Sequence, residues 1–174
     1  MKKCDFIIIF LIFNQLFWGC KQRELEIGKP APEFNSTTIG GGNLTLSNLH
    51  GTYILLYFWA TDCESCRAEH SALMDVYQQF QDASFENGQD FNIVGIALHS
   101  NESNYRQIIR EDKLRIIHHI LDNSPTKNAF DAPLATLYKI KQIPARILLD
   151  GNGTILGVNL TLEELKQLLQ RKLL

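Results

Sequence analysis

The sequence predicts an α/β fold in which helices cover both faces of a mixed central sheet. Two continuous apolar runs, TYILLYFWA at 52–60 and FNIVGIAL at 91–98, are typical of strands that are buried on both faces. A helical pattern of apolar residues follows the first run, and the chain closes with a second amphipathic helix. Because strands and helices alternate in this way, we expect a sheet enclosed between helices.

The remaining elements are expected in a clear order along the chain. The turn GGGN at 40–43 separates two strand-like segments and predicts an N-terminal β-hairpin. The first helix begins near Cys63, and Thr161 with Glu164 forms a capping-box pattern at the start of the last one. Between them we expect, in order, a helix at 102–111, a strand at 115–121, a helix at 132–140, and a strand hairpin formed by 145–150 and 154–160.

Composition restricts the class of protein. The chain has 174 residues, 45% hydrophobic and 21% charged, which is enough for one globular domain with its own core. The formal charge is −2, and the basic residues are scattered rather than clustered. Because phosphate binding needs clustered Lys and Arg, we expect no nucleic-acid partner. We also expect the protein to be a monomer.

The N-terminus has the features of an export signal. Two lysines precede the apolar run FIIIFLIF at 6–13, which is too short to span a bilayer but typical of a signal-peptide core. Gly19 precedes Cys20, and this pair resembles the bacterial lipobox, in which such a cysteine is acylated. An ordinary secretory peptide or a short hydrophobic anchor is the alternative.

These features predict the domain organisation and the location. We expect a signal peptide at 1–19, a lipid-anchored tether at 20–27 and a folded domain at 28–174. The acyl chains on Cys20 would hold the protein on the membrane of a bacterial cell envelope, facing the periplasm. Disulfides form and persist in that compartment.

Cys63 and Cys66 form a C-x-x-C pair directly after the first buried strand. A zinc site needs four ligands and the chain has no second cysteine pair, while a staple that closes so short a loop stabilises little. A redox pair fits better, because a helix N-terminus stabilises a thiolate. We therefore expect Cys63 to attack and Cys66, one turn further into the helix, to be more buried and to resolve.

The segment LYFWATDCESC resembles the active site of the thioredoxin superfamily. Together with IGKPAPEF, IPARILLDGNG and LTLEELKQLL, it is similar to the membrane-tethered TlpA/ResA group of thiol–disulfide oxidoreductases over about residues 25–174. The resemblance implies a thioredoxin-like fold with a strand and a helix inserted between the active site and a cis-proline. It implies no cofactor, substrates that are protein thiols or disulfides, and electrons from a membrane dithiol donor, with cytochrome c maturation as one possible role.

The resemblance also implies roles for further residues. Ile143 and Pro144 match the X-Pro segment that lies opposite the cysteine pair, and with Trp59 they are expected to dock the substrate. Glu69 matches a glutamate that handles protons during exchange, and a solvated glutamate in the first helical turns is the alternative. His70 could serve instead, but we expect it to lie at the surface.

Two other functions stay open. One is a peroxiredoxin-like thiol peroxidase, although the chain lacks the diagnostic residues of that class. Only Arg146 favours it, because an arginine could polarise a peroxide; a surface or strand-edge arginine is the alternative. A non-catalytic, partner-binding lipoprotein with a structural disulfide is the other. Asp62 and Glu64 flank Cys63, oppose the helix dipole and should raise the pKa of its thiol, which favours a reductase.

Overall fold

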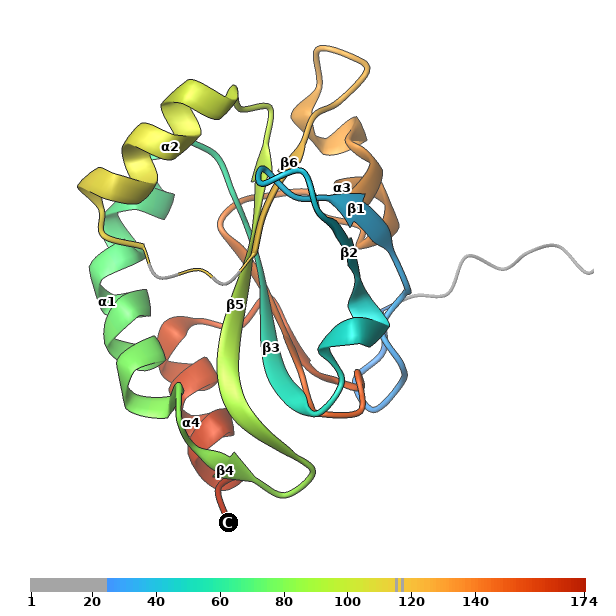
Figure 1. The fold of residues 1–174 in the computed structure, drawn as a ribbon, viewed down its shortest axis with the longest axis vertical. Helices are drawn as coiled ribbons and strands as arrows, with labels where there is room; N and C mark the ends of the chain where they lie inside the picture. The colour runs from blue at the N-terminus through green and yellow to red at the C-terminus, as the bar shows by residue number, and fades with distance from the viewer. Residues whose placement is uncertain (1–24, 115, 117) are drawn as a thin grey trace, which may run out of the picture.

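The computed structural model describes residues 25–114, 116 and 118–174. It shows a thioredoxin-like α/β fold with a mixed central sheet between two layers, as the sequence predicts (Figure 1). The expected signal peptide and the lipid-anchor residue Cys20 lie outside the described residues. No helix in the described part of the chain is long and apolar enough to cross a membrane.

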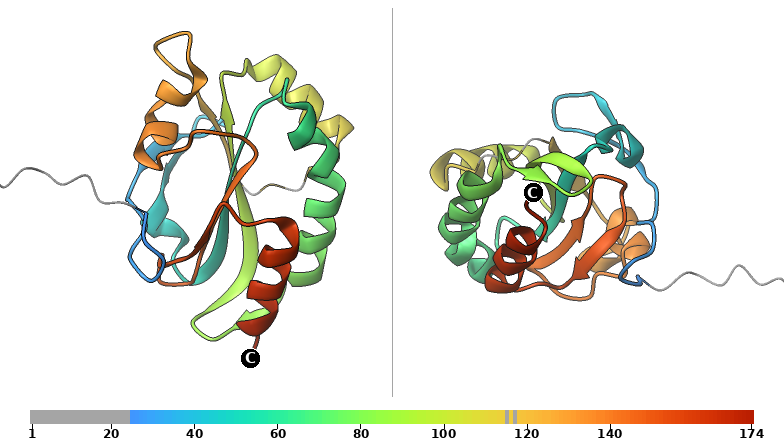
Figure 2. Two further views of the ribbon diagram at one scale, coloured as in Figure 1. Left: turned by 180° about the vertical axis from the view of Figure 1, so that it is seen from behind. Right: turned by 90° about the horizontal axis from the view of Figure 1, so that it is seen from below.

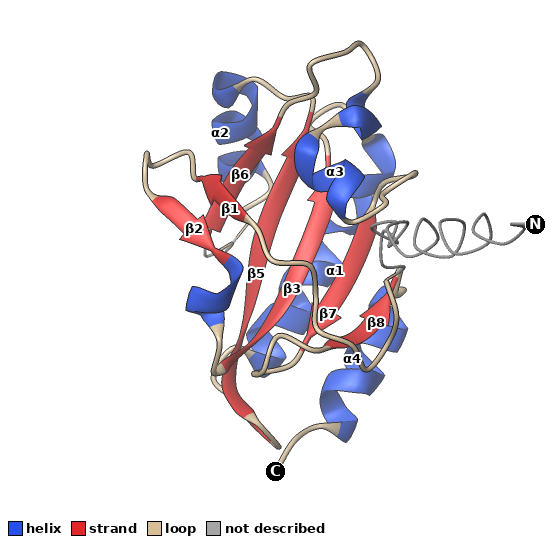
Figure 3. Ribbon diagram, turned by 90° about the vertical axis from the view of Figure 1, so that its right-hand side faces the viewer, coloured by secondary structure: helices blue, strands red, loops and turns tan. Residues whose placement is uncertain are grey.

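The central sheet is built around strand β3, and Figure 3 shows its strands side by side. Strands β5 and β6 run parallel to β3 on one side, while β7 on its other side is antiparallel to it. Strand β8 continues the sheet beyond β7, and the short β4 pairs with the start of β5. The bounds of these strands are β3 Thr52–Trp59, β4 Ser84–Phe85, β5 Gly88–Leu98, β6 His118–Asp122, β7 Ala145–Leu149 and β8 Ile155–Val158.

Helices lie on both faces of the sheet, as Figure 2 shows from behind and from below. Helices α1, α2 and α4 cover one face, and α3 with the β1–β2 hairpin covers the other (Figure 1). The bounds are β1 Asn35–Thr37, β2 Asn43–Thr45, α1 Glu64–Phe80, α2 Glu102–Glu111, α3 Pro133–Leu137 and α4 Leu162–Arg171. Two short 3-10 helices, η1 Leu46–Leu49 and η2 Ala129–Asp131, complete the second layer.

The alternation of side chains along β3 explains the continuous apolar run. Tyr53, Leu55, Tyr57 and Trp59 belong to the core cluster under α1, α2 and α4. Their neighbours Ile54, Leu56 and Phe58 belong to the cluster on the α3 side. Successive strand residues point to opposite faces, so a strand enclosed by two layers has to be apolar at every position.

Most of the expected elements are present, and the inserted pair is α2 with β6. The capping box at the start of α4 is formed, with Thr161 and Glu164 exchanging hydrogen bonds. Some boundaries differ from the expectation. Helix α3 ends at Leu137, because Lys139 has a positive φ of 50° that ends the helical run. Strand β8 ends at Val158, before the expected end at 160. Strand β6 covers His118–Asp122, and residues 115 and 117 of the expected strand lie outside the described residues.

The short strand β4 was not among the expected elements, and neither were η1 and η2. Strand β5 begins at Gly88, three residues before the apolar run, and β4 pairs with it through a tight turn. The dipeptide Asn87-Gly88 is typical of such turns and could have revealed it. Gly151 packs so closely against this turn that a Cβ there would lie 2.0 Å from the Asn87 carbonyl oxygen.

Candidate active site

The two cysteines lie where β3 gives way to α1. Cys63 is the N-cap of α1, and its Sγ accepts a hydrogen bond of 3.1 Å from the backbone N–H of Cys66. A disulfide joins the two residues, whose Cα atoms are 5.2 Å apart. Cys66 is 0% exposed, whereas Cys63 is partly exposed. Both expectations, Cys63 at the helix N-terminus and Cys66 buried behind it, are confirmed.

The Ile143-Pro144 segment lies at the same end of the sheet. The peptide bond between the two residues is cis, and both side chains are half-buried. The segment leads into β7, whose first residue Ala145 pairs with Phe58 near the end of β3. This register brings Pro144 to the level where β3 ends and the turn to Cys63 begins.

Glu69 is half-buried in an ion pair and is not a freely solvated residue. Its carboxylate pairs with the guanidinium of Arg146, on β7, and its Oε1 accepts a hydrogen bond of 3.1 Å from the Tyr57 hydroxyl. The Glu69 side chain is 19% exposed, and Arg146 as a residue is 7% exposed. The surface position considered for Arg146 is therefore wrong: the side chain points into the protein toward Glu69.

The Tyr57 hydroxyl, from β3, links the Glu69 side chain to the backbone of Cys66 on the same helix. It also lies 3.4 Å from the backbone carbonyl oxygen of Cys66. Burial, together with the negative charge of Glu69, raises the pKa of Tyr57 well above its usual value, so the hydroxyl keeps its proton and acts as a donor. A polar cluster of Tyr57, Glu69 and Arg146 therefore lies beside Cys66, inside the core.

His70 is buried, contrary to the expected surface position. It is 1% exposed, and its Nδ1 lies 2.7 Å from Oδ2 of Asp112 at the end of α2. Since a carboxylate can only accept, Nδ1 carries the proton. Burial lowers the pKa of His70, which keeps the ring neutral at physiological pH. The ring also meets Trp59 edge to face, with centroids 5.0 Å apart.

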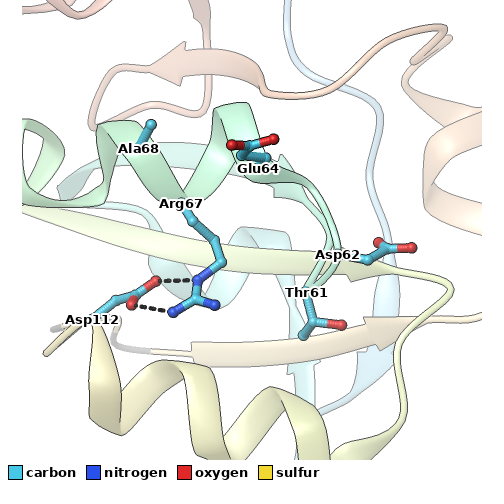
Figure 4. Close-up of a pocket in the computed structure, with 6 residues that line it drawn as sticks. All are labelled: Thr61, Asp62, Glu64, Arg67, Ala68 and Asp112. Atoms are coloured by element: carbon cyan, nitrogen blue, oxygen red, sulfur yellow. Dashed lines mark hydrogen bonds and ion pairs between the residues drawn. The ribbon is translucent and has the colours of Figure 1, made fainter.

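Arg67 completes this contact between α1 and α2. Its guanidinium donates two hydrogen bonds, of 2.9 and 3.2 Å, to the Asp112 carboxylate (Figure 4). The hydrogen bonds from Arg67, followed by that from His70, lower the pKa of Asp112. The i, i+3 spacing of Arg67 and His70 on α1 lets both reach one carboxylate. The sequence offered no sign of this pairing, because Asp112 is 42 residues from His70.

Trp59 does not lie where a docking residue would have to be. Its side chain is 0% exposed and packs among Tyr57, His70 and Tyr105 in the core. A residue without exposed surface cannot contact a protein substrate, so the docking role expected for Trp59 is wrong. The ring instead packs beneath α1, the helix that carries the cysteines, and contacts His70 of that helix.

An open cavity adjoins the N-terminus of α1. It has a volume of about 470 Å³ and lies between the turn before Cys63 and the end of α2 (Figure 4). Its walls are formed by Thr61, Asp62, Glu64, Arg67, Ala68 and Asp112. Three of these six residues are acidic, and the single arginine is already paired with Asp112. The surface beside Cys63 therefore carries excess negative charge.

The arrangement is suited to thiol–disulfide exchange. It offers an accessible sulfur at a helix N-terminus, a buried second sulfur, and ionisable groups behind them. Among the described residues, no group of three or more His, Cys, Asp or Glu side chains could hold a metal ion.

Residues 51–155 match the family model described as thioredoxin-like. The chain belongs to the thioredoxin-like family. Its likeness to the TlpA/ResA group is also borne out by a curated relative, the thiol-disulfide oxidoreductase ResA of Oceanobacillus iheyensis. That protein is 29% identical over 134 residues, which are 75% of this chain and 62% of the relative. Mouse nucleoredoxin is 28% identical over 80% of this chain, but the match spans only 28% of nucleoredoxin.

Solved structures of thioredoxin-like proteins agree with this fold. The thioredoxin domain of a thiol-disulfide oxidoreductase from Bacteroides vulgatus superposes with a TM-score of 0.68 and is 26% identical. The match covers 85% of this chain and 98% of that domain. The chain spans less than two thirds of the length of the two curated relatives named above.

Proposed function

We propose that this thioredoxin-like protein is a thiol–disulfide oxidoreductase that reduces disulfides of extracytoplasmic proteins. The observation that carries the proposal is the asymmetry of the cysteine pair: Cys63 is accessible at the helix N-terminus and Cys66 is fully buried behind it. A substrate can reach only the first sulfur, and the second can react only within the protein. That asymmetry is what a two-step exchange requires.

The reaction begins from the reduced pair. The Cys63 thiolate attacks one sulfur of the substrate disulfide, forms a mixed disulfide and releases the first substrate thiol. Cys66 then loses its proton and attacks Sγ of Cys63, which releases the second substrate thiol and closes the Cys63–Cys66 disulfide. Two electrons pass from the dithiol to the substrate, and a dithiol donor at the membrane restores the pair.

We assign Glu69 as the base that accepts the proton of Cys66. It lies three residues further along α1, and the Tyr57 hydroxyl reaches both its carboxylate and the Cys66 backbone carbonyl. Ile143 and Pro144 dock the substrate, because they lie at the same end of the sheet as the cysteines and an extended peptide can pair with backbone there.

Arg146 no longer favours a thiol peroxidase. Its guanidinium is engaged by Glu69 and by the Leu160 carbonyl oxygen, to which it donates a hydrogen bond of 2.7 Å. A peroxide would have to displace one of these partners. Thiol–disulfide exchange uses the pair without such a rearrangement.

The sequence supports a location at the cell envelope, and the family resemblance suggests two substrate classes. A lipid on Cys20 would hold the domain at the cell envelope, where partly oxidised proteins are the available substrates. Apocytochrome c whose haem-attachment thiols have been oxidised to a disulfide is one substrate class that suits a reductase there, and damaged disulfides of other exported proteins are the second.

A redox titration tests the function. The purified chain, with Cys4 and Cys20 replaced by serine, is equilibrated with thiol buffers and its free thiols are alkylated and counted by mass. A reversible two-electron transition below about −230 mV would support a reductase, and one above about −150 mV would indicate an oxidant. A pair that stays oxidised in strong reductant would contradict the proposal and favour a partner-binding role. Rapid loss of thiols to peroxide without a partner protein would favour a peroxidase.

A further inference from the structure

The three elements that build the active site meet at one half-buried carboxylate. Glu69 comes from α1, which carries the cysteines, and Tyr57 comes from β3, which leads to them. Arg146 comes from β7, two residues after Pro144. Figure 3 shows β3 and β7 side by side with α1 behind them. The Glu69 carboxylate, from α1, contacts Tyr57 of β3 and Arg146 of β7.

Few groups in the described part of the chain compensate the positive charge of the Arg146 guanidinium. The residue is 7% exposed, one guanidinium nitrogen donates to the Leu160 carbonyl oxygen, and Nε has no hydrogen-bond partner in the described part of the chain. Taking a guanidinium out of water is costly unless an anion is close. Glu69 supplies that anion, and the ion pair exists only while the carboxylate is ionised.

The proton of Cys66 gives this pairing a chemical consequence. A buried thiol that ionises next to a fixed negative charge is opposed by that charge. A buried carboxyl group without a cation beside it would instead favour its neutral form, and a neutral carboxyl group cannot accept a proton. Glu69 can therefore act as a base for Cys66 only if a positive charge compensates it.

We propose that Arg146 is a positioning residue of the exchange reaction, which keeps Glu69 ionised and oriented to receive the proton of Cys66. The proposal rests on the proposed oxidoreductase function and deepens it. It gives a role to a side chain that neither touches the substrate nor belongs to the C-x-x-C motif.

The resolving step then balances within the cluster. The Cys66 S–H bond breaks and its proton moves to Glu69, so the negative charge passes from the carboxylate to the sulfur. Arg146 stays positive, and the proton transfer leaves the summed charge of the three groups at zero. The Cys66 thiolate attacks Sγ of Cys63, the bond from Cys63 to the substrate sulfur breaks, and the substrate leaves as a thiolate. When the substrate departs as a thiolate, the proton on Glu69 is released to that thiolate or to water, which restores the carboxylate.

Ellman's reagent separates the two steps of this reaction. The probe reacts with the reduced chain in which Cys4 and Cys20 are serine, so that Cys63 and Cys66 are the only thiols. The first equivalent of thionitrobenzoate reports attack by Cys63, and the second reports attack by Cys66 on the mixed disulfide. The variants are Arg146→Met, Arg146→Lys, Glu69→Gln and the double variant Arg146→Met with Glu69→Gln, and each rate is measured across pH.

We expect Arg146→Met to slow the second phase by about tenfold or more, as for loss of general-base catalysis, and to move its pH dependence to higher pH. The first phase should change little. Arg146→Lys should recover most of the rate, because it restores the charge. The double variant should be no slower than Glu69→Gln alone, since both substitutions remove the same proton acceptor.

The double variant also keeps the proposal testable if a single substitution prevents folding. It removes both charges together, so it leaves no unpaired charge in the core if a single substitution fails to fold. A double variant markedly slower than Glu69→Gln alone would overturn the proposal. So would a folded Arg146→Met protein with an unchanged second phase, or one that slows both phases equally. A wild-type chain without any second phase would instead contradict the oxidoreductase function itself.

Discussion

Tyr57 and Arg146 are direct cross-strand neighbours on β3 and β7, and both side chains reach the carboxylate of Glu69. Their register is fixed by the sheet, so the hydroxyl and the guanidinium hold the carboxylate from two adjacent strands. Glu69 itself is on α1, and the contact therefore joins the helix of the cysteines to the strand that follows Pro144. Substitutions at any of these three residues should therefore alter the reactivity of Cys66.

Replacing Tyr57 with phenylalanine tests the donor in this cluster. The substitution keeps the ring and removes the 3.1 Å hydrogen bond to a charged acceptor. We expect the free energy of unfolding to fall by about 1–3 kcal/mol, as for other hydrogen bonds to charged groups. Urea denaturation measures the loss, and the second Ellman phase should slow in the same variant.

The matched control is Tyr77→Phe. Tyr77 is a half-buried tyrosine of α1 whose hydroxyl makes no hydrogen bond within the described residues. It should unfold at the same urea concentration as the wild type. Equal losses in the two variants would show that the hydrogen bond to Glu69 contributes nothing specific.

The roles of the two cysteines can be separated by single substitutions. Cys66→Ser leaves the accessible sulfur at the helix N-terminus, and Cys63→Ser leaves the fully buried one. We expect iodoacetamide to alkylate the Cys66→Ser variant at least about tenfold faster at pH 7, a difference equivalent to one pKa unit. Mass spectrometry of the folded variants measures both rates. Equal rates, or faster reaction of Cys66, would reverse the assigned roles.

The sequence was sufficient for the fold and for the cysteine pair because both depend on local patterns. The apolar run at 52–60 and the helical spacing after Cys63 are periodicities within one element, and the two cysteines are three residues apart. The position of Ile143 and Pro144 needed the family resemblance, since nothing local indicates that they approach the end of β3.

The environment of the cysteines could not be predicted, because it is made by contacts between distant segments. The charge of Arg146 gave no indication that β7 would turn it inward toward Glu69. His70 is polar and was expected outside, yet it occupies a position of α1 that faces the sheet, and Asp112 satisfies one of its nitrogens. Trp59 was expected to dock the substrate, whereas strand alternation places it in the core cluster with Tyr57.

His70 and Asp112 should make the stability of the fold depend on pH. Burial lowers the pKa of His70 below its usual value of 6.5, so the unfolded chain binds this proton at higher pH than the folded protein does. Stability is therefore lost as pH falls below about 6.5. The pKa of Asp112 is lowered by Arg67, which removes further stability at still lower pH. Thermal unfolding between pH 8 and pH 5, at about half-unit steps, measures this decline.

The His70→Phe variant tests whether His70 causes this pH dependence of stability. His70→Phe keeps an aromatic ring against Trp59 but cannot titrate, so its midpoint temperature should decline less between pH 7 and pH 5. The control is His50→Gln, at an exposed position, which should follow the wild-type curve. If His70→Phe also follows the wild-type curve, another group causes the acid sensitivity.

Asp62 and Glu64 should set the redox potential of the pair. Both side chains are exposed and flank Cys63, where their negative charges oppose the stabilisation that the N-terminus of α1 gives to a thiolate. Replacing them with asparagine and glutamine should lower the pKa of the Cys63 thiol. A more stable thiolate favours the dithiol, so the midpoint potential should rise by about 10–30 mV.

The control for this experiment is Asp75→Asn, an exposed position further along α1. It removes one of the two charges that the double variant removes, at a site about three turns from Cys63, so its potential should match the wild type. Salt distinguishes a charge effect from a change in structure, because added salt should shrink the difference between wild type and the Asp62→Asn, Glu64→Gln variant. A potential that does not move, or a difference that persists in high salt, would mean that these carboxylates do not tune the reductase. The excess negative charge beside Cys63 would then act on something other than the thiol, and the cavity between the Cys63 turn and α2 is the surface where a substrate would meet it.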